Sequence, residues 1–233
     1  MDDNNLNYFI KKSLPIKHNY IGTFTADDII ENPLLKINLI SKNYIYLSFI
    51  VNTLKLSNVP FQVGHWVAFV IFKSKKGLSL KYFDSFADSP RKYYHFASFI
   101  SNIKKTCHIH KVPFKLDIMK KQIQGPYSKV CGLYAAFAII KSHHNRRDSL
   151  KKLFEQFSGN FKINDSKILS FMYKQWPGES CHNNPIYNNN KMGLELLRKQ
   201  PPFCPKKTLS AKKCFNKCKC TSSLCCEEKM KGI

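Results

Sequence analysis

The sequence has no long uninterrupted apolar run. No window approaches the roughly 20 uncharged apolar residues that a membrane-spanning helix needs, which argues against an integral membrane protein. The N-terminal segment MDDNNLNYFIKK is acidic and then amphipathic, without the apolar centre of a secretory signal. We therefore expect a protein that is not secreted and that is made and kept in a reducing compartment.

Acidic side chains are also scarce. The 15 Asp and Glu residues are set against 38 Lys and Arg, so the formal net charge is +23 at pH 7. Such a field favours polyanions, first nucleic acid and then acidic proteins or membrane surfaces. Lysine-rich and Asn-rich runs such as NNNK also fit an AT-rich genome. The charge therefore permits contact with DNA or RNA and does not indicate sequence recognition.

Cysteine is sparse in most of the chain and dense at its end. Three of the nine cysteines, Cys107, Cys131 and Cys181, are scattered, and the other six lie in the last thirty residues. A disulfide framework is not expected for such a distribution in a reducing compartment. The isolated and the clustered cysteines therefore need separate explanations.

The composition predicts one folded domain followed by a tail. A chain of 233 residues with 43% apolar residues can bury one sizeable core. We predict a domain over 1–178 and a flexible, basic, Cys-rich tail over 179–233, where periodicity is lost. The tail's cysteine spacings fit no common zinc motif, so no metal site is predicted, although thiolate clusters do bind zinc or copper(I). Tethering to nucleic acid and a tail without function are equally open.

Hydrophobic periodicity predicts alternating strands and helices within the domain. Residues 6 to 30 are expected to form a short lead-in followed by YIGTFTADDII, in which Thr25 is the N-cap of a short helix. We expect strands over 43–51, 63–73, 78–86 and 114–124. We expect helices over 89–105, 132–144, 148–157 and 165–175. The segment 63–73 is apolar at nearly every position, which is typical of a strand buried on both faces, and it should pair with 78–86 as a hairpin.

Cys131 lies between the polar loop QGPYSKV and the apolar stretch over 132–144. That stretch is apolar on nearly every face, which predicts a central buried helix. A thiol at the start of a helix meets the positive end of the helix dipole and free backbone amides, and both favour the thiolate. A buried cysteine is more often structural, but the polar loop before this one favours a nucleophile.

His65 and Asp84 are placed to serve such a nucleophile. His65 stands at the front of a buried strand, and imidazole can take a thiol proton and return it to a leaving amine near neutral pH. Asp84 closes the next strand, within reach of His65 if the two strands pair, and could hold the imidazole tautomer. Taken singly, these residues are more often a surface histidine and an ordinary turn aspartate. Gln124, seven residues before Cys131, could donate its side-chain amide to an oxyanion.

These residues occur in order within motifs that resemble the adenovirus protease (adenain) family, which belongs to the clan of ubiquitin-like-protein peptidases. The resemblance covers roughly residues 8 to 175. It is strongest in GHWVAF (64–69), YFDSF (82–86) and QGPYSKVCGL (124–133), and YIGTF (20–24) also contributes. The whole ordered set is far more specific than any single piece.

The resemblance implies an α+β fold in which a mixed central β-sheet packs on a buried helix that carries the nucleophile at its N-terminus. It implies that Cys131 is the nucleophile, His65 the general base and acid, Asp84 the orienting acid and Gln124 the oxyanion donor.

The resemblance also implies a substrate-binding surface. Trp66 and Gly132 would contact the substrate, with Trp66 shaping the floor beside the catalytic pair, although an ordinary core tryptophan fits the sequence equally well.

The family resemblance further implies substrates and activators. The expected substrates are precursor structural (capsid or core) proteins, cleaved beside Gly. DNA and a short peptide joined through a cysteine assist adenovirus-type enzymes. Cys107 is the candidate for that link by rough position only, and an unlinked thiol is the simpler interpretation. We expect a monomer, located in the virion and in the host nucleus or cytoplasm, with nucleic acid bound electrostatically and no membrane contact.

One departure keeps two other functions open. Adenovirus enzymes usually carry Glu where this chain has Asp84, whereas desumoylating relatives carry Asp. A peptidase that removes a ubiquitin-like modifier is therefore the first alternative. A catalytically silent, nucleic-acid-binding virion protein is the second, and the intact set of four residues argues against it.

Overall fold

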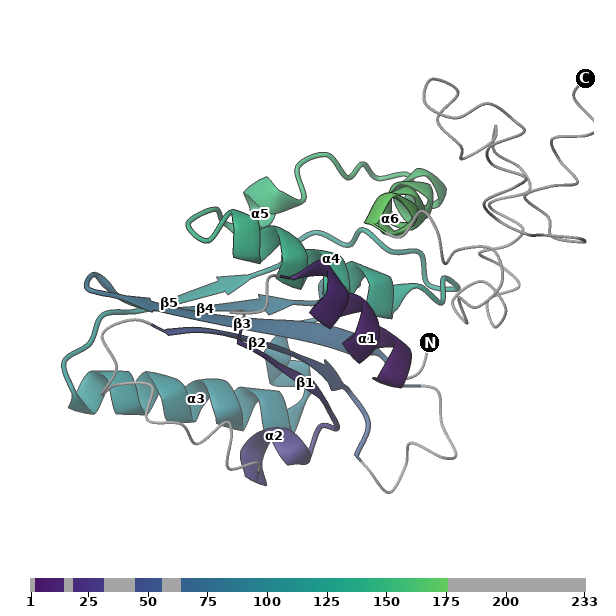
Figure 1. The fold of residues 1–233 in the computed structure, drawn as a ribbon. Helices are drawn as coiled ribbons and strands as arrows, with labels where there is room; N and C mark the ends of the chain where they lie inside the picture. The colour runs from purple at the N-terminus through teal and green to yellow at the C-terminus, as the bar shows by residue number, and fades with distance from the viewer. Residues whose placement is uncertain (1–2, 15–18, 32–44, 56–63, 176–233) are drawn as a thin grey trace, which may run out of the picture.

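The computed structural model describes residues 3–14, 19–31, 45–55 and 64–175, and helices cover both faces of a five-stranded sheet (Figure 1). The strands are β1 (Tyr20–Phe24), β2 (Ile45–Asn52), β3 (Trp66–Ser74), β4 (Gly77–Phe83) and β5 (Phe114–Ile118). The helices are α1 (Asp3–Ser13), α2 (Asp28–Glu31), α3 (Tyr94–Ile109), α4 (Cys131–His144), α5 (Leu150–Leu153) and α6 (Phe161–Gln175), with a 3-10 turn η3 at Pro90–Lys92.

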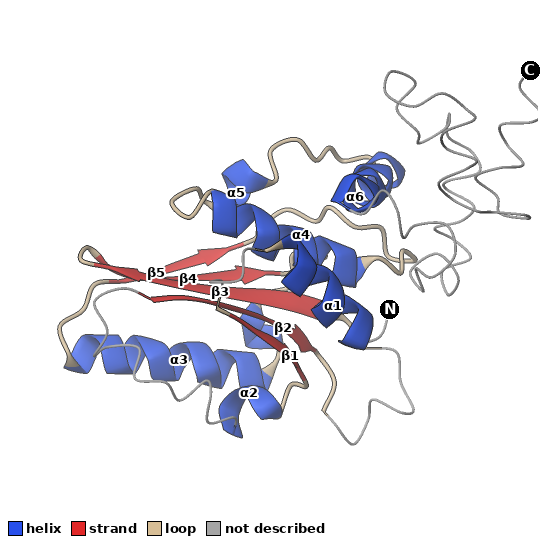
Figure 2. Ribbon diagram, viewed as in Figure 1, coloured by secondary structure: helices blue, strands red, loops and turns tan. Residues whose placement is uncertain are grey.

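The sheet is mixed, and its strands follow one another in chain order (Figure 2). β3 pairs antiparallel with both β2 and β4, whereas β1 runs parallel to β2 and β5 parallel to β4. The predicted hairpin of β3 and β4 is confirmed, with Ser74 opposite Gly77 at its turn. Since β4 and β5 are parallel, the chain crosses over between them, and α3 makes this crossover. The predicted α+β class with a mixed sheet is therefore confirmed.

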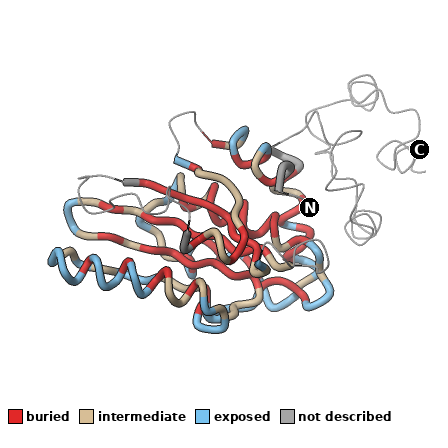
Figure 3. The backbone as a smooth tube through the Cα atoms, turned by 90° about the horizontal axis from the view of Figure 1, so that it is seen from below, coloured by how far each residue is buried: buried red, intermediate tan, exposed pale blue. Residues whose placement is uncertain are grey.

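The central strand β3 is buried on both faces, as its apolar sequence predicts. Val67, Phe69 and Ile71 belong to the core cluster that also contains the buried side chains of α3. Trp66 and Ala68 belong to the cluster on the other face, together with residues of α1, α4, α5 and α6. The buried stretches in the middle of the fold are visible in Figure 3. The sheet therefore separates two hydrophobic cores, and α4 lies in the larger one.

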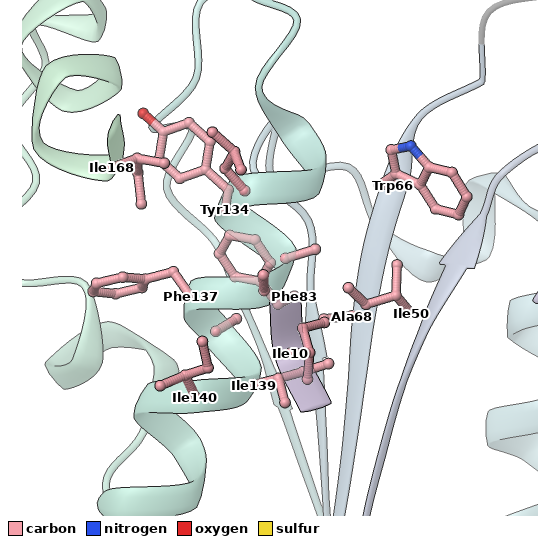
Figure 4. Packing of buried hydrophobic residues seen from close by; sticks show 14 of the residues in the cluster. Ile10, Ile50, Trp66, Ala68, Phe83, Tyr134, Phe137, Ile139, Ile140 and Ile168 are labelled. Atoms are coloured by element: carbon pink, nitrogen blue, oxygen red, sulfur yellow. The ribbon is translucent and has the colours of Figure 1, made fainter. Parts of the chain in front are cut away.

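Helix α4 is apolar on nearly every side because it is enclosed. It contacts the sheet through β2 and β3 and also contacts α1, α5 and α6. Tyr134, Phe137, Ile139 and Ile140 point in different directions from it toward these neighbours (Figure 4). The predicted buried helix over 132–144 is thus confirmed, and it begins one residue earlier, at Cys131.

Some predicted elements are wrong. The expected lead-in is the helix α1, whose fully buried Leu6, Phe9 and Ile10 join the core around α4. The strand expected over 114–124 ends at Ile118 because the following backbone bonds to the end of β4 and to the loop after it, as when Ile123 N–H donates to the Ser85 carbonyl.

The helix expected over 148–157 is a single turn, α5, after which the chain bends and packs Phe154 and Phe157 against Phe137. The tail over 179–233 lies outside the described residues. Among the described helices, none is both long and apolar enough to cross a membrane.

Lys81 is a charged residue inside this core. The Leu78, Leu80 and Tyr82 side chains of β4 join the cluster of α3, and Lys81 alternates to the other face of the sheet, where it is 4% exposed. Its Nζ makes no hydrogen bond among the described residues. Burial lowers the pKa of the Lys81 ammonium to about 8, although the nearby Asp117 and Asp148 carboxylates act to raise it.

The burial of Lys81 predicts how the free energy of unfolding depends on pH. The pKa of Lys81 is about 8 in the folded chain, and the ordinary value of 10.5 applies to the unfolded chain. Between these values the unfolded state holds a proton that the folded state lacks, so raising the pH stabilises the folded state. From about pH 7.5 to about pH 9.5, the free energy of unfolding should rise by about 2 kcal/mol more in wild type than in Lys81→Met. Urea unfolding measures this difference, and parallel pH curves for the two proteins would contradict the assignment.

Candidate active site

The site is built at the edge of the sheet where β3 begins and β4 ends. In an antiparallel pair these two ends meet, so His65, just before β3, and Asp84, just after β4, become neighbours. The Nε2 atom of His65 lies 2.9 Å from Oδ1 of Asp84. The His65 side chain is 13% exposed and the Asp84 side chain is fully buried. His65 and Asp84 are therefore in contact, as expected from the predicted pairing of the two strands.

Thr53, the residue directly after β2, holds the backbone of His65 from the other side. Thr53 N–H donates to the His65 carbonyl at 2.8 Å, and His65 N–H donates to Oγ1 of Thr53 at 3.1 Å. Gly64 allows this approach because an ideal Cβ there would lie 1.8 Å from Oδ1 of Asn52. That oxygen is itself occupied, since it accepts the Leu54 N–H at 3.0 Å. The imidazole is thus presented from a backbone fixed on both sides.

The turn after β4 fixes the carboxylate of Asp84. Oδ1 accepts the Phe86 N–H at 2.8 Å as well as the imidazole, and Oδ2 accepts the Tyr82 hydroxyl at 3.4 Å. Ala87 closes the turn with its N–H on the Asp84 carbonyl and has φ of 61°, a conformation that is uncommon for residues other than glycine. The Phe86 ring lies over the imidazole, with ring centroids 4.5 Å apart. A buried carboxylate held in this way can orient the imidazole and stabilise its charged form.

Cys131 approaches the same imidazole as the first residue of α4. The Nδ1 atom of His65 makes no hydrogen bond of standard geometry among the described residues, yet the thiol is close enough for the two groups to shift each other's pKa. Burial acts to lower the pKa of His65, but the hydrogen bond and charge of Asp84, together with the Cys131 thiolate, raise it to about 9. Burial acts to raise the pKa of the Cys131 thiol, but His65 and the backbone N–H groups of Trp66 and Gly132 lower it. Both shifts favour a thiolate–imidazolium pair.

Gln124 is fully buried in the loop that leads to α4. Its Oε1 accepts the hydroxyl of Ser85 at 2.5 Å, and its Nε2 donates to the carbonyl of Ser128 at 2.7 Å. The backbone N–H groups of Ile123 and Gln124 both donate to the Ser85 carbonyl. The loop of Gln124 is therefore bonded directly to the turn that carries Asp84.

Helices α4 and α6 anchor the same loop. The carbonyl of Ile123 accepts the Nδ2 hydrogen of Asn164 at 2.9 Å. The single hydrogen of the Tyr134 hydroxyl is shared between Oδ1 of Asp165, at 2.9 Å, and the Ile123 carbonyl, at 3.3 Å. All three partners are buried, so the loop before Cys131 has a fixed path across the end of the sheet.

The remaining predicted residues lie in different settings. Trp66 is 7% exposed and belongs to the core around α4, and Gly132 is buried in the first turn of that helix. Cys107 is far less accessible than a linking cysteine should be, since it is 1% exposed within the core of α3 and burial raises the pKa of its thiol. Among the described residues, no three His, Cys, Asp or Glu side chains cluster closely enough to hold a metal ion.

Sequence reasoning missed three supporting residues. Thr53 had no distinguishing pattern, because its partner His65 is reached only across the β2–β3 pair. Phe86 and Ser85 could have been found from the motif YFDSF, since residues directly after a strand-end aspartate share its turn. The assembled groups can supply a thiolate nucleophile, a proton donor and a buried carboxylate that orients it.

The close approach of Gly64 to the Asn52 side chain predicts the effect of adding a side chain at position 64. Gly64→Ala should displace the Asn52 side chain and the backbone of His65, which weakens the thiolate–imidazolium pair. We expect alkylation of Cys131 by iodoacetamide to slow about tenfold at a pH below the pKa of the thiol, where a rise of one pKa unit lowers the thiolate fraction tenfold. Mass spectrometry of the peptide containing Cys131 measures this rate. Asn52→Ala should keep the wild-type rate and should restore most of it when combined with Gly64→Ala; a double variant as slow as Gly64→Ala alone would contradict the steric account.

No protein-family model matches the sequence, and a search of curated proteins finds no match. Among solved structures, the chain is similar to the ASFV pS273R protease, with 16% identity and a TM-score of 0.48, over 75% of this chain and 65% of that one. It is also similar to the C-terminal Ulp1 protease domain solved with Smt3, the yeast ortholog of SUMO, with 16% identity and a TM-score of 0.39, over 62% of this chain and 66% of that one. A third similar structure is ChlaDub1 from Chlamydia trachomatis, with 14% identity and a TM-score of 0.43, over 73% and 74% of the two chains. The chain thus spans slightly less than two thirds of the ASFV protease. At these identities and scores the likeness concerns the general fold, and the chemistry of the site rests on the contacts described above.

Proposed function

We propose that this chain is a cysteine peptidase in which Cys131 is the nucleophile, His65 the general base and acid, and Asp84 the orienting acid. The observation that carries the proposal is the position of the His65 imidazole, which bonds to the buried Asp84 carboxylate at 2.9 Å and lies close enough to the Cys131 thiol to lower its pKa. A core cysteine has no need of a charged partner, whereas a nucleophile does. The lowered pKa of the thiol and the raised pKa of the imidazole both support the catalytic assignment.

The contacts suggest how a peptide bond would be cleaved. The Cys131 thiolate attacks the carbonyl carbon, and the developing oxyanion is met by backbone N–H at the start of α4 and by Nε2 of Gln124. Protonated His65 gives its proton to the leaving amine, which leaves a thioester on Cys131. Neutral His65 then takes a proton from water, the hydroxide attacks the thioester, and the acid product and the thiolate are released.

The substrate is proposed to carry a small residue, especially Gly, beside the scissile bond. The backbone N–H of Trp66 is close enough to Cys131 to lower the pKa of its thiol, so the first residues of β3 and α4 lie close together at the nucleophile. A wide side chain next to the cleaved bond would have to pass between them. Precursor structural proteins with Gly-containing cleavage sites are the substrates that we favour, as the adenain-like motifs imply.

Removal of a ubiquitin-like modifier is the second candidate. The acid beside His65 is Asp84 rather than the Glu usual in adenovirus enzymes, and this favours the alternative. Both candidates use the same catalytic residues and a narrow approach to the thiol. The two candidate functions differ only in the substrate that carries the Gly-containing segment, which is a structural-protein precursor in one and a modifier conjugate in the other.

One experiment tests the peptidase and separates the two substrates. Purified full-length protein is incubated with Gly-containing peptides from structural-protein precursors and, separately, with isopeptide-linked modifier conjugates. We expect cleavage of the precursor peptides, and a loss of at least about 10⁴-fold in Cys131→Ala, as removal of a catalytic nucleophile produces. Cys107→Ala is the matched control and should retain activity. Equal cleavage by Cys131→Ala would disprove the nucleophile assignment, whereas cleavage confined to the conjugates would establish deconjugation.

Activation by DNA and by a linked peptide stays a prediction. The described residues show what linkage of a peptide to Cys107 would require. Because Cys107 lies buried in the core of α3, a disulfide there would require the end of this helix to open.

A further inference from the structure

Ser85 connects the two halves of the proposed machinery. It follows Asp84 directly in the turn after β4, and its side chain is fully buried. Its hydroxyl donates to Oε1 of Gln124 at 2.5 Å, and its carbonyl accepts two backbone N–H groups from the loop of Gln124. The turn that orients His65 through its first residue therefore holds the Gln124 side chain through its second.

The orientation of the Gln124 carboxamide is chemically decisive, although its shape is nearly symmetric. If Nε2 faces the reacting carbonyl, an N–H group can stabilise the oxyanion; if Oε1 faces it, two negatively polarised oxygens repel each other. The structure holds the amide at both ends, since Ser85 donates to Oε1 and the Ser128 carbonyl accepts from Nε2. The carboxamide nitrogen carries two hydrogens, and Ser128 uses one of them. The second N–H has no hydrogen-bond partner among the described residues.

We propose that Ser85 is a positioning residue for the oxyanion donor: its hydroxyl fixes the Gln124 carboxamide so that Nε2 supplies its second N–H to the tetrahedral intermediate. This inference rests on the proposed peptidase function and deepens it. Ser85 touches neither the thiol nor the imidazole through any hydrogen bond of the described residues. Its hydroxyl is therefore expected to act on the reaction through Gln124.

The simplest test replaces the hydroxyl and separates turnover from substrate binding. Ser85→Ala should lower kcat about tenfold with KM changed by less than twofold, because a misoriented amide loses part of the roughly 100-fold effect of an oxyanion donor. Ser85→Cys, similar in size and a weaker donor, should fall between Ala and wild type. Ser142→Ala is the matched control, since Ser142 is equally buried on α4 and its hydroxyl has no partner among the described residues; its kcat should be that of wild type.

A double-mutant cycle distinguishes this role from a merely structural one. Gln124→Ala should lower kcat about 100-fold, and adding Ser85→Ala to it should change kcat by less than a further twofold. The pH profile of Cys131 alkylation should be the same in Ser85→Ala as in wild type, because the thiolate–imidazolium pair is intact. A peptide aldehyde, which forms a tetrahedral adduct with the thiol, should bind Ser85→Ala about tenfold more weakly, in step with kcat.

Three outcomes would overturn the inference while leaving the peptidase function in place. They are full activity in Ser85→Ala, an equal loss from Ser85→Ala in the wild-type and Gln124→Ala backgrounds, and a shifted alkylation profile, which would place the effect on His65 or Asp84. An inactive wild-type protein would overturn the proposed function and this inference together.

Discussion

The buried carboxylate of Asp84 is the constraint on which the site depends. A carboxylate with no exposure to water is costly unless it is paired and hydrogen-bonded. Asp84 meets this demand with the imidazole of His65, the backbone N–H of Phe86 and the hydroxyl of Tyr82. Since the best compensation comes from a charged imidazole, the same pairing raises the pKa of His65 and, through it, favours a thiolate at Cys131. One buried charge thus sets the protonation of the proposed catalytic pair.

The fold explains why His65, Asp84 and Cys131 lie close together although they are far apart in the sequence. Antiparallel pairing of β3 and β4 brings His65 to Asp84, and the packing of α4 against β3 brings Cys131 to the start of the same strand. The loop that links the sheet to α4 is bonded to the turn of Asp84 by Ser85 and to α6 by Asn164. His65, Asp84 and Cys131, the proposed catalytic residues, therefore lie at the ends of regular elements, and the loop of Gln124 is held by buried polar contacts.

Much of this arrangement could be predicted from the sequence. The apolar run of β3, the turn before β4 and the apolar helix after Cys131 are strong local patterns, so the hairpin and the buried helix were predictable, and the hairpin required His65 and Asp84 to approach. Other features depend on contacts between distant segments. The spacing of Leu6, Phe9 and Ile10 is helical, but only packing against α4 makes α1 a core element. β1 pairs in parallel with the next strand, β2, across a long connection, and the bond from Ser85 to Gln124 spans 39 positions. No local pattern reveals such pairs.

The proposed chemistry requires His65 to be an imidazolium next to a Cys131 thiolate at neutral pH. Nuclear magnetic resonance of ¹⁵N-histidine protein, with the His65 signal assigned by its loss in His65→Ala, measures the charge of this ring directly. We predict that the ring titrates with a pKa of about 9 in wild type and with a lower pKa in Cys131→Ala, because the thiolate that supports its charge is gone. A His65 ring that is neutral at pH 7.5 in wild type, or that titrates identically in Cys131→Ala, would contradict this account.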